Sequence, residues 1–195
     1  MPYSLAHKEE TNKKIVESAR ILFNRHGFVN VTIDMVMENA GLTRGGFYNH
    51  FKNKEALYSA AVSSFLMGRG AEWREEAGVN VEKPSIETIR HMMKSYLSSE
   101  HLGDLDGQCP MIALPSDVAR AGPEVQTSYQ DLLEAMIWLF EHNLGGKSAP
   151  SRKKSLSLAA LCIGGMVVAR TLPNSDLAEE IREAAFNAAD EILAS

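Results

Sequence analysis

The polar side chains best suited to binding an anion or a base lie in residues 41–51, GLTRGGFYNHF. If the two phenylalanines of this segment point inward at helical spacing, Arg44, Gly45, Tyr48 and His50 point outward. Arginine pairs with guanine or with a phosphate group, and tyrosine and histidine donate hydrogen bonds to phosphate oxygens. The segment therefore predicts a surface that binds nucleic acid.

Two adjacent glycines interrupt this surface. Gly45 and Gly46 each cost roughly 1 kcal/mol in a helix relative to alanine. One interpretation is that they let the helix backbone come close to a groove of DNA. The other is a weak helical turn that the fold tolerates, and the sequence leaves both open.

The elements expected to position this surface are two short helices joined by a turn. Thr32 caps the first helix, Asp34 favours its first turn, and Gly41 ends it. Thr43 caps the second helix almost at once, which predicts a helix-turn-helix whose second helix enters the major groove. The apolar side chains expected to fix the crossing of the two helices are Val36, Ala40, Leu42, Phe47 and Phe51.

Helical apolar spacing continues on both sides of this motif. A helix from about Glu9 is expected to end at Gly27, and Phe28–Ile33, which alternates like a strand without a partner, is interpreted as an extended connection. Asn53 caps a long helix that runs to about Ala77. Further helices are expected at Ser85–Glu100, Pro110–Ala121, Pro123–Leu144, Ser151–Leu172 and Asp176–Ala194. The chain is therefore predicted to be all-α.

The composition indicates a cytoplasmic globular protein. Of the 195 residues, 45% are hydrophobic and 23% are charged, and residues 1–10 do not resemble a signal peptide. The longest uncharged run, Ser155–Ala169, is shorter than the roughly 20 residues that a membrane span needs. The two cysteines are too few for a disulfide framework.

Charge is distributed unevenly along the chain. Residues 1–55 carry eight Lys and Arg against six Asp and Glu, a balance of 8 − 6 = +2, whereas the remaining residues carry twelve against nineteen, a balance of 12 − 19 = −7. A basic end on an acidic body suggests an anion-binding face at the N-terminus.

The segment TIDMVMENAGLTRGGFYNHFKNKEALYSA, with ARILFNRHGF before it, resembles the N-terminal domain of the TetR family of regulators. The resemblance covers about residues 10–60. It is carried by Thr32, by Ala40-Gly41-Leu42, by Thr43-Arg44-Gly45-Gly46, by Phe47-Tyr48-Asn49-His50-Phe51 and by Lys54-Glu55-Ala56-Leu57.

This resemblance implies a DNA-binding role for each matched position. Tyr48, His50 and Lys54 take the phosphate-contacting positions, and Thr32 caps its helix and touches the DNA backbone. The base-reading stretch is then Thr43, Arg44, Gly45 and Gly46. The amide end of the helix that Asn53 caps adds to the phosphate clamp.

The resemblance also implies the organisation and activity of the chain. Residues 1–54 are expected to form a three-helix DNA-binding domain, and residues 55–195 a helical domain for effector binding and dimerisation. The expected function is repression of transcription at a near-palindromic duplex operator, from which a small-molecule effector releases the protein. We expect no catalytic residue and no cofactor in such a regulator. The six histidines show no spacing typical of metal ligands.

Residues 151–195 are expected to form the homodimer interface. One face of Asp176–Ala194 is apolar, and the preceding helix has small residues four positions apart, at Ala160 and Gly164 and at Gly165 and Ala169. Small residues permit close helix contact, although both helices can also bury against their own subunit. The apolar face of the last helix is Leu177, Ile181, Ala184, Ala185, Ala188 and Ile192.

The effector pocket is expected between the central helices, where methionines and aromatic residues collect. For any single one of them, ordinary core packing is favoured over contact with a ligand. The predicted lining is Phe65, Met92, Met93, Tyr96, Met111, Tyr129, Leu133 and Met136, with Phe140 nearby.

Cys109 opens a helix after a polar loop, where helix amides lower the pKa of a thiol and suit it to sensing oxidants or electrophiles. The alternative is a half-buried small residue, and Cys162 in an apolar helix is expected to be structural. Cys109 with His101 also suggests an enzymatic nucleophile and base, yet no third orienting residue supports the pair. A third hypothesis is that the chain is a helical protein-interaction module that does not bind DNA.

Overall fold

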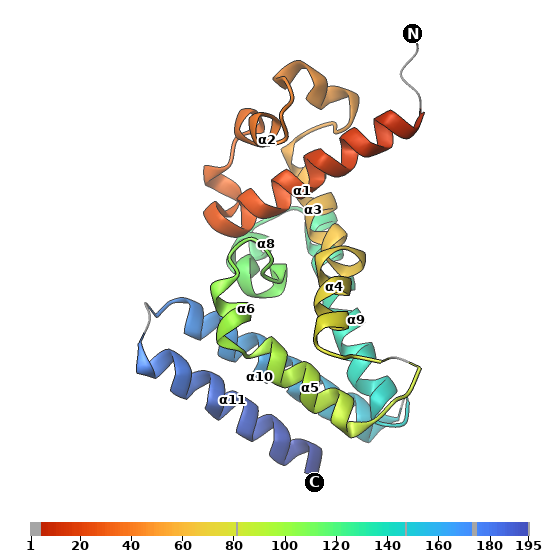
Figure 1. Ribbon diagram of the computed structural model, residues 1–195, viewed down its shortest axis with the longest axis vertical. Coiled ribbons are helices and arrows are strands. Elements are labelled where there is room, and N and C mark those ends of the chain that lie inside the picture. Colours follow the sequence, from red (N-terminus) through yellow and green to blue (C-terminus); the bar gives the residue numbers. More distant parts are fainter. Residues whose placement is uncertain (1–4, 81, 147, 173–174, 195) are drawn as a thin grey trace.

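The computed structural model describes residues 5–80, 82–146, 148–172 and 175–194, and every regular element in these ranges is a helix. The prediction of an all-α chain is confirmed. At one end of the molecule lie α1 (Leu5–Asn30), α2 (Ile33–Asn39) and the 3₁₀ helix η1 (Arg44–Asn49) (Figure 1). The other helices are α3 (Lys54–Met67), α4 (Arg69–Glu76), α5 (Ile86–Tyr96), α6 (Ser99–Gly103), α7 (Pro110–Ala113), α8 (Pro115–Ala119), α9 (Pro123–Asn143), α10 (Ala149–Arg170) and α11 (Asp176–Ala194).

Two apolar cores hold these helices together, and α3 contributes to both. Leu57, Tyr58 and Val62 belong to the core that α1, α2 and η1 close. Phe65, one turn further on, belongs to the larger core of the body. The predicted division between residues 54 and 55 falls at the start of α3 and stays a prediction, because a single helix links the two cores.

The end of α1 differs from the expected extended connection. Gly27 has φ +74°, a left-handed conformation in which an added Cβ would lie 2.8 Å from a carboxylate oxygen of Asp117. The chain then resumes a helical turn to Asn30. The reason is packing, because the ring of Phe28 stacks on Tyr58 with centroids 4.8 Å apart and Val31 is fully buried.

The long helix expected from Asn53 to Ala77 is two helices. Asn53 caps α3 as predicted, since its Oδ1 accepts a hydrogen bond from the amide of Ala56 at 2.8 Å. The helix then breaks at Gly68 (φ −100°, ψ −118°). Beyond the break the backbone of α4 packs closely on the end of α3, since a Cβ on Gly70 would lie 2.6 Å from the carbonyl oxygen of Phe65.

Two further predicted helices are also divided. Ser85–Glu100 splits into α5 and α6. Pro110–Ala121 splits into α7 and α8 at Leu114, just before Pro115, because proline lacks the N–H that would continue the helix.

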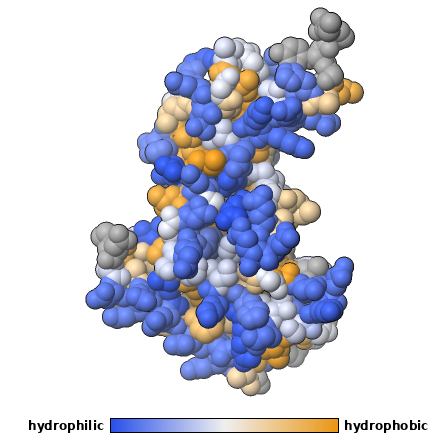
Figure 2. Space-filling view, in the orientation of Figure 1, coloured by the Kyte–Doolittle hydropathy of each residue, from blue (hydrophilic) through white to orange (hydrophobic). Residues whose placement is uncertain are grey.

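The body ends in a pair of long helices, α10 and α11, which pack along each other beside α9 and α5 (Figure 1). Gly165 permits their close approach, since a Cβ there would lie 2.8 Å from the Cβ of Ala185. Polar and charged residues cover most of the face shown in Figure 2, with apolar patches between them. No helix within the described ranges is both long and apolar enough to cross a bilayer.

Candidate DNA-binding surface

The first helix of the predicted motif is fixed at both ends. The hydroxyl of Thr32 caps α2 by accepting a hydrogen bond from the amide of Met35 at 3.2 Å. At the other end, the buried hydroxyl of Ser18 on α1 donates to the carbonyl of Val36 at 2.8 Å. α2 is therefore anchored against α1, and the turn that follows starts from a defined place.

The turn follows the sequence prediction, and so do four of its five core residues, whereas Ala40 is only partly buried and is not part of this core. Gly41 has φ +70°, and the amide of Leu42 returns to the carbonyl of Met37 at 2.8 Å. Val36 and Phe47 are fully buried in the N-terminal core, and the partly buried side chains of Leu42 and Phe51 pack against it.

The second helix of the motif is a 3₁₀ helix rather than the expected α-helix. The carbonyl of Thr43 accepts from the amide of Gly46 at 3.0 Å, and the amide of His50 bonds the carbonyl of Phe47 at 2.9 Å. The predicted side-chain cap by Thr43 is not formed. Two adjacent glycines explain the tighter helix, because they weaken the α-helical alternative.

Arg44, Gly45 and Tyr48 share the exposed side of η1. The guanidinium of Arg44 forms an ion pair with Asp34 on α2 at 2.6 Å, with both side chains more than half exposed. Gly45 leaves the backbone bare, since an added Cβ would meet no atom within 4 Å. Tyr48 is 61% exposed and packs edge-on against Phe47.

His50 lies at the border between η1 and the start of α1. Together with Lys8 and Lys13 it lines a hollow of about 350 Å³. Burial, and then the nearby charge of Lys8, lowers the pKa of His50. Sequence reasoning did not single out Lys8 or Lys13; the only signal for them was the positive balance of residues 1–55.

Lys54 points inward. Its ammonium donates to the carbonyl of Phe28 and lies 4.2 Å from the centre of that ring. Burial lowers the pKa of Lys54, and the charge of Asp117 opposes this shift. Lys54 therefore ties the start of α3 to the end of α1.

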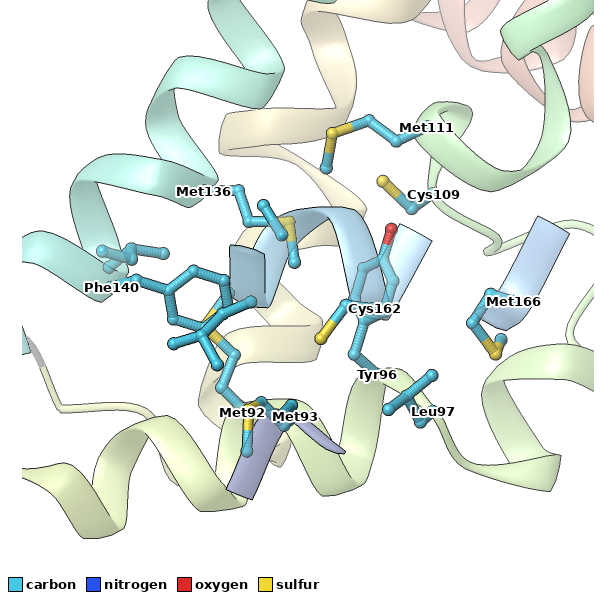
Figure 3. Close-up of a cluster of buried hydrophobic side chains, with 14 of the residues drawn as sticks. Met92, Met93, Tyr96, Leu97, Cys109, Met111, Met136, Phe140, Cys162 and Met166 are labelled. Carbon is cyan, nitrogen blue, oxygen red and sulfur yellow. The ribbon is translucent and has the colours of Figure 1, made fainter. Parts of the chain in front are cut away.

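A pocket in the body contains five of the eight predicted effector-pocket residues. The structure places Phe65, Met92, Tyr96, Met111 and Met136 around one space of about 40 Å³ between α3, α4, α5 and α9. In Figure 3, Met111 and Met136 lie in the upper part of the cluster and the α5 methionines Met92 and Met93 in the lower part, with Tyr96 beside them.

The other three predicted lining residues lie in or against the core instead. Met93 is fully buried, Leu133 packs on the core, and the Tyr129 hydroxyl donates to the carbonyl of Met111 at 3.2 Å. Sequence reasoning missed several lining residues, because they come from segments distant in the chain. They are Leu66, Gly70, Trp73, Arg74, His101, Cys109, Leu132 and Leu139.

Cys109 is buried within this pocket wall. The expectation that the start of α7 lowers the pKa of its thiol is wrong, because burial raises that pKa to about 12. Burial also lowers the pKa of His101. The two ring nitrogens of His101 bond the carbonyl of Tyr96 at 2.8 Å and the amide of Cys109 at 3.4 Å, so the imidazole meets backbone groups rather than the thiol.

Within the described part of the chain, no group of three His, Cys, Asp or Glu residues is placed to hold a metal ion.

Comparisons with known proteins agree with the architecture of the N-terminal end. Residues 15–61 match the sequence model of a family described as bacterial regulatory proteins, tetR family. The transposon Tn10 TetC protein of Escherichia coli is 43% identical over 65 residues, which is 31% of this chain and 33% of the relative. The regulator TtgR of Pseudomonas putida is 39% identical over 56 residues, 29% of this chain and 27% of the relative. The chain thus spans a third or less of the length of these curated relatives.

Solved structures extend the likeness to the whole fold. A TetR transcriptional regulator from Chloroflexus aurantiacus has a TM-score of 0.79 at 21% identity, over 98% of both chains. The reduced form of E. coli NemR has a TM-score of 0.77 at 16% identity, over 93% of this chain and 96% of that one. The N-terminal helix-turn-helix of this chain therefore matches the tetR family of bacterial regulatory proteins, and the chain as a whole has the fold of solved TetR regulators.

Proposed function

We propose that this chain is a cytoplasmic, dimeric regulator that binds a near-palindromic DNA operator and represses transcription until a small molecule releases it. The observation that carries the proposal is the exposed side of η1. Arg44 and Tyr48 are exposed there, the backbone at Gly45 is accessible, and the buried ring of Phe47 fixes the helix on the N-terminal core. The names of relatives support the proposal. A Corynebacterium efficiens protein called HTH-type transcriptional repressor AcnR is 31% identical over 84 residues.

In this proposal η1 enters the major groove and its exposed side chains divide the work. Arg44 reads a base together with Thr43, after exchanging the carboxylate of Asp34 for a guanine edge. That exchange costs little, because an exposed ion pair contributes at most about 1 kcal/mol. Gly45 and Gly46 allow the backbone to approach the base pairs.

Phosphate groups are proposed to lie on both sides of η1. Tyr48 donates from the exposed side, and Thr32 at the start of α2 contacts the neighbouring strand. His50 donates from the border with α1, where the positive charges of Lys8 and Lys13 outnumber the single negative charge of Glu9.

Lys54 has a different proposed role. Its ammonium would reach a phosphate only by leaving the carbonyl of Phe28. We therefore assign Lys54 a positioning role, in which it sets α3 against the end of α1 while the capped start of α3 faces the phosphates.

The homodimer is proposed to form through α10 and α11. Ala160, Gly164 and Val168 are exposed on α10, and a Cβ on Gly164 would meet no atom of its own subunit within 4 Å. Ile181 and Ala184 of α11 continue the same apolar groove, which measures about 370 Å³. A second copy that covers this surface would place two η1 helices on one duplex.

A polar junction supports coupling between the pocket and α1. The buried guanidinium of Arg20 donates to the carbonyl of Asp106, and the amide of Asn24 donates to the carbonyl of Gln108 at 2.7 Å. The next residue, Cys109, lines the pocket. An effector that displaces this wall would move the α6–α7 segment and with it α1. A coupling of about 1–3 kcal/mol is typical, or roughly 5–150-fold in operator affinity.

Duplex binding at several salt concentrations tests the proposal. We expect affinity to fall steeply as salt rises, because lysines and arginines displace counterions from DNA. Arg44→Gln should weaken binding to a preferred duplex by at least about fivefold and alter the preferred sequence.

Lys153→Gln is the matched control, since it removes an exposed positive charge from α10, in the body. It should change affinity little. Salt-independent binding, or equal effects of the two substitutions, would refute the assignment of η1.

A further inference from the structure

The pocket of the body is apolar over most of its wall. Phe65 comes from α3, Trp73 from α4, and Leu132, Met136 and Leu139 from α9. No aspartate or glutamate belongs to its lining. The wall therefore suits an apolar molecule and offers nothing to neutralise a cation.

One hydroxyl in this wall lacks a normal acceptor. Tyr96 is 3% exposed, and its hydroxyl forms no hydrogen bond with a nitrogen or oxygen of the described residues. The hydroxyl lies toward the sulfur of Cys109 (Figure 3), which is a weak hydrogen-bond partner. Burial raises the pKa of Tyr96 well above its ordinary value, so this group keeps its proton and can donate it to a bound oxygen.

One cation in the same wall lacks a counterion. Arg74 on α4 donates from Nη2 to the carbonyl of Leu66 at 2.8 Å, and it forms no ion pair with a described carboxylate. Arg74 is partly buried, and burial lowers the pKa of its guanidinium. A carboxylate would oppose this effect of burial through charge-assisted hydrogen bonds to the remaining guanidinium donors.

We infer that this pocket binds a small organic carboxylate with an aromatic or aliphatic body, whose oxygens meet Arg74 and Tyr96. The inference rests on the proposed function, in which the molecule bound here is the effector. Its apolar body lies against Trp73, Leu132 and Met136.

The described conformation is the closed form of this site. A space of about 40 Å³ holds only a few water molecules. A carboxylate with a ring therefore binds only when α4 moves away from α5 and α9. The break at Gly68 provides a place for that movement, because α4 is a separate helix from α3.

Fluorescence of Trp73 measures binding directly. The chain has two tryptophans, and Trp138 is 45% exposed on α9, so the Trp138→Phe protein reports from Trp73 alone. The probes are phenylpropionate, phenylpropionamide and phenylpropylamine, which share one body and differ in charge. We expect the carboxylate to bind about tenfold more tightly than the amide, and the amine to bind most weakly.

Variants separate the two polar contacts. Arg74→Gln should bring the carboxylate to within about threefold of the amide, whereas Arg74→Lys should retain a preference for the carboxylate. Tyr96→Phe should weaken the carboxylate and the amide alike and keep the difference between them. Lys94→Gln is the control, because it removes an exposed charge from α5 outside this pocket.

The order in which the three probes bind is measured without any substitution in the pocket. It therefore tests the inference even if Arg74→Gln fails to fold. Equal binding of the three probes, or tighter binding of the amine, overturns the inference. Absence of carboxylate binding up to about 10 mM also overturns it, since fragments of this size reach roughly millimolar dissociation constants. DNA is absent from these titrations, so their failure leaves duplex binding, which is measured separately, as the test of the proposed function.

Discussion

At the scale of single residues, Gly45 is the position at which the two interpretations of η1, a helix that reads DNA and an ordinary surface turn, make different predictions. It lies on the exposed side of η1, and no atom lies within 4 Å of the position that a Cβ would take. Neither packing nor a left-handed backbone therefore requires glycine here, because its φ is not positive. Close approach to another molecule is the first interpretation of this glycine, and a weak turn that favours the 3₁₀ helix is the second.

Gly45→Ala should weaken operator binding by about tenfold while the protein remains as stable or becomes slightly more stable. The methyl group would push the backbone from the base pairs, at a cost similar to a lost base contact of about 1–3 kcal/mol. Alanine also favours helix by roughly 1 kcal/mol. Fluorescence anisotropy with labelled operator and thermal unfolding measure the two effects.

Gly103→Ala is the matched control, since its Cβ also meets no atom and it lies at the end of α6 in the body. Unchanged operator affinity in Gly45→Ala would show that the weak-turn interpretation of these glycines is correct.

Local spacing predicted the residues of the turn because their roles depend on near neighbours. Thr32 caps α2 by bonding the amide of Met35, three residues later. Phe47 packs with Val36 and Leu42 in the same core. The contact between Lys54 and Phe28 spans 26 residues. A contact between residues so far apart leaves no periodic pattern in the sequence. The sequence prediction therefore placed this lysine on the outer surface.

At the scale of helices, the break between α7 and α8 follows from Pro115, whereas the break between α3 and α4 depends on how those two helices pack. Gly68 and Gly70 lie within a continuous apolar pattern, which predicted one helix. The close approach of Gly70 to the backbone of Phe65 exists only once α3 and α4 are folded together. The same holds for the pocket, whose wall combines α4 and α6 residues that no single stretch of sequence relates.

Two arginines of α1 contact Asp106 in the α6–α7 segment, one with a buried side chain and one with an exposed side chain. Arg20 is 4% exposed and donates to the carbonyl of Asp106 while it pairs with Glu17. Arg25 pairs with the carboxylate of the same Asp106, but both side chains are more than 40% exposed. This ion pair lowers the pKa of Asp106.

Arg20→Gln should lower the free energy of unfolding by about 1–3 kcal/mol, because it removes a buried charged donor from the carbonyl of Asp106. Arg25→Gln should lower it by less than about 1 kcal/mol, since water and salt screen an exposed pair. Urea denaturation at one protein concentration measures both. A larger loss for Arg25→Gln would mean that the exposed pair, and not the buried donor, holds α1 on the body.

At the scale of the whole molecule, the apolar groove on α10 and α11 is the surface that a second copy is proposed to cover. Of the predicted small-residue pairs, Gly165 faces α11 within the subunit and Ala169 is fully buried, whereas Ala160 and Gly164 are exposed. Val168 is 46% exposed beside them. One helix thus uses one small-residue face for its own fold and has another free for a partner.

Val168→Asp should convert a dimer of twice the 21.4 kDa chain mass into a monomer. The carboxylate would be buried without a partner at the interface, which costs several kcal/mol. Val29→Asp makes the same chemical change at a 77% exposed position on α1 and should leave the dimer intact. Sedimentation equilibrium at micromolar concentration gives the masses, and a Val168→Asp dimer would place the interface elsewhere.

Two copies of this chain are proposed to read DNA sequence through η1. The most direct test is to incubate the purified protein with a pool of random duplexes, recover the bound fragments and sequence them. We predict enrichment of one near-palindromic motif, with half-sites spaced so that both η1 helices meet the same face of the duplex. Recovery of fragments without a shared motif, or no recovery above a pool incubated without protein, would contradict the account.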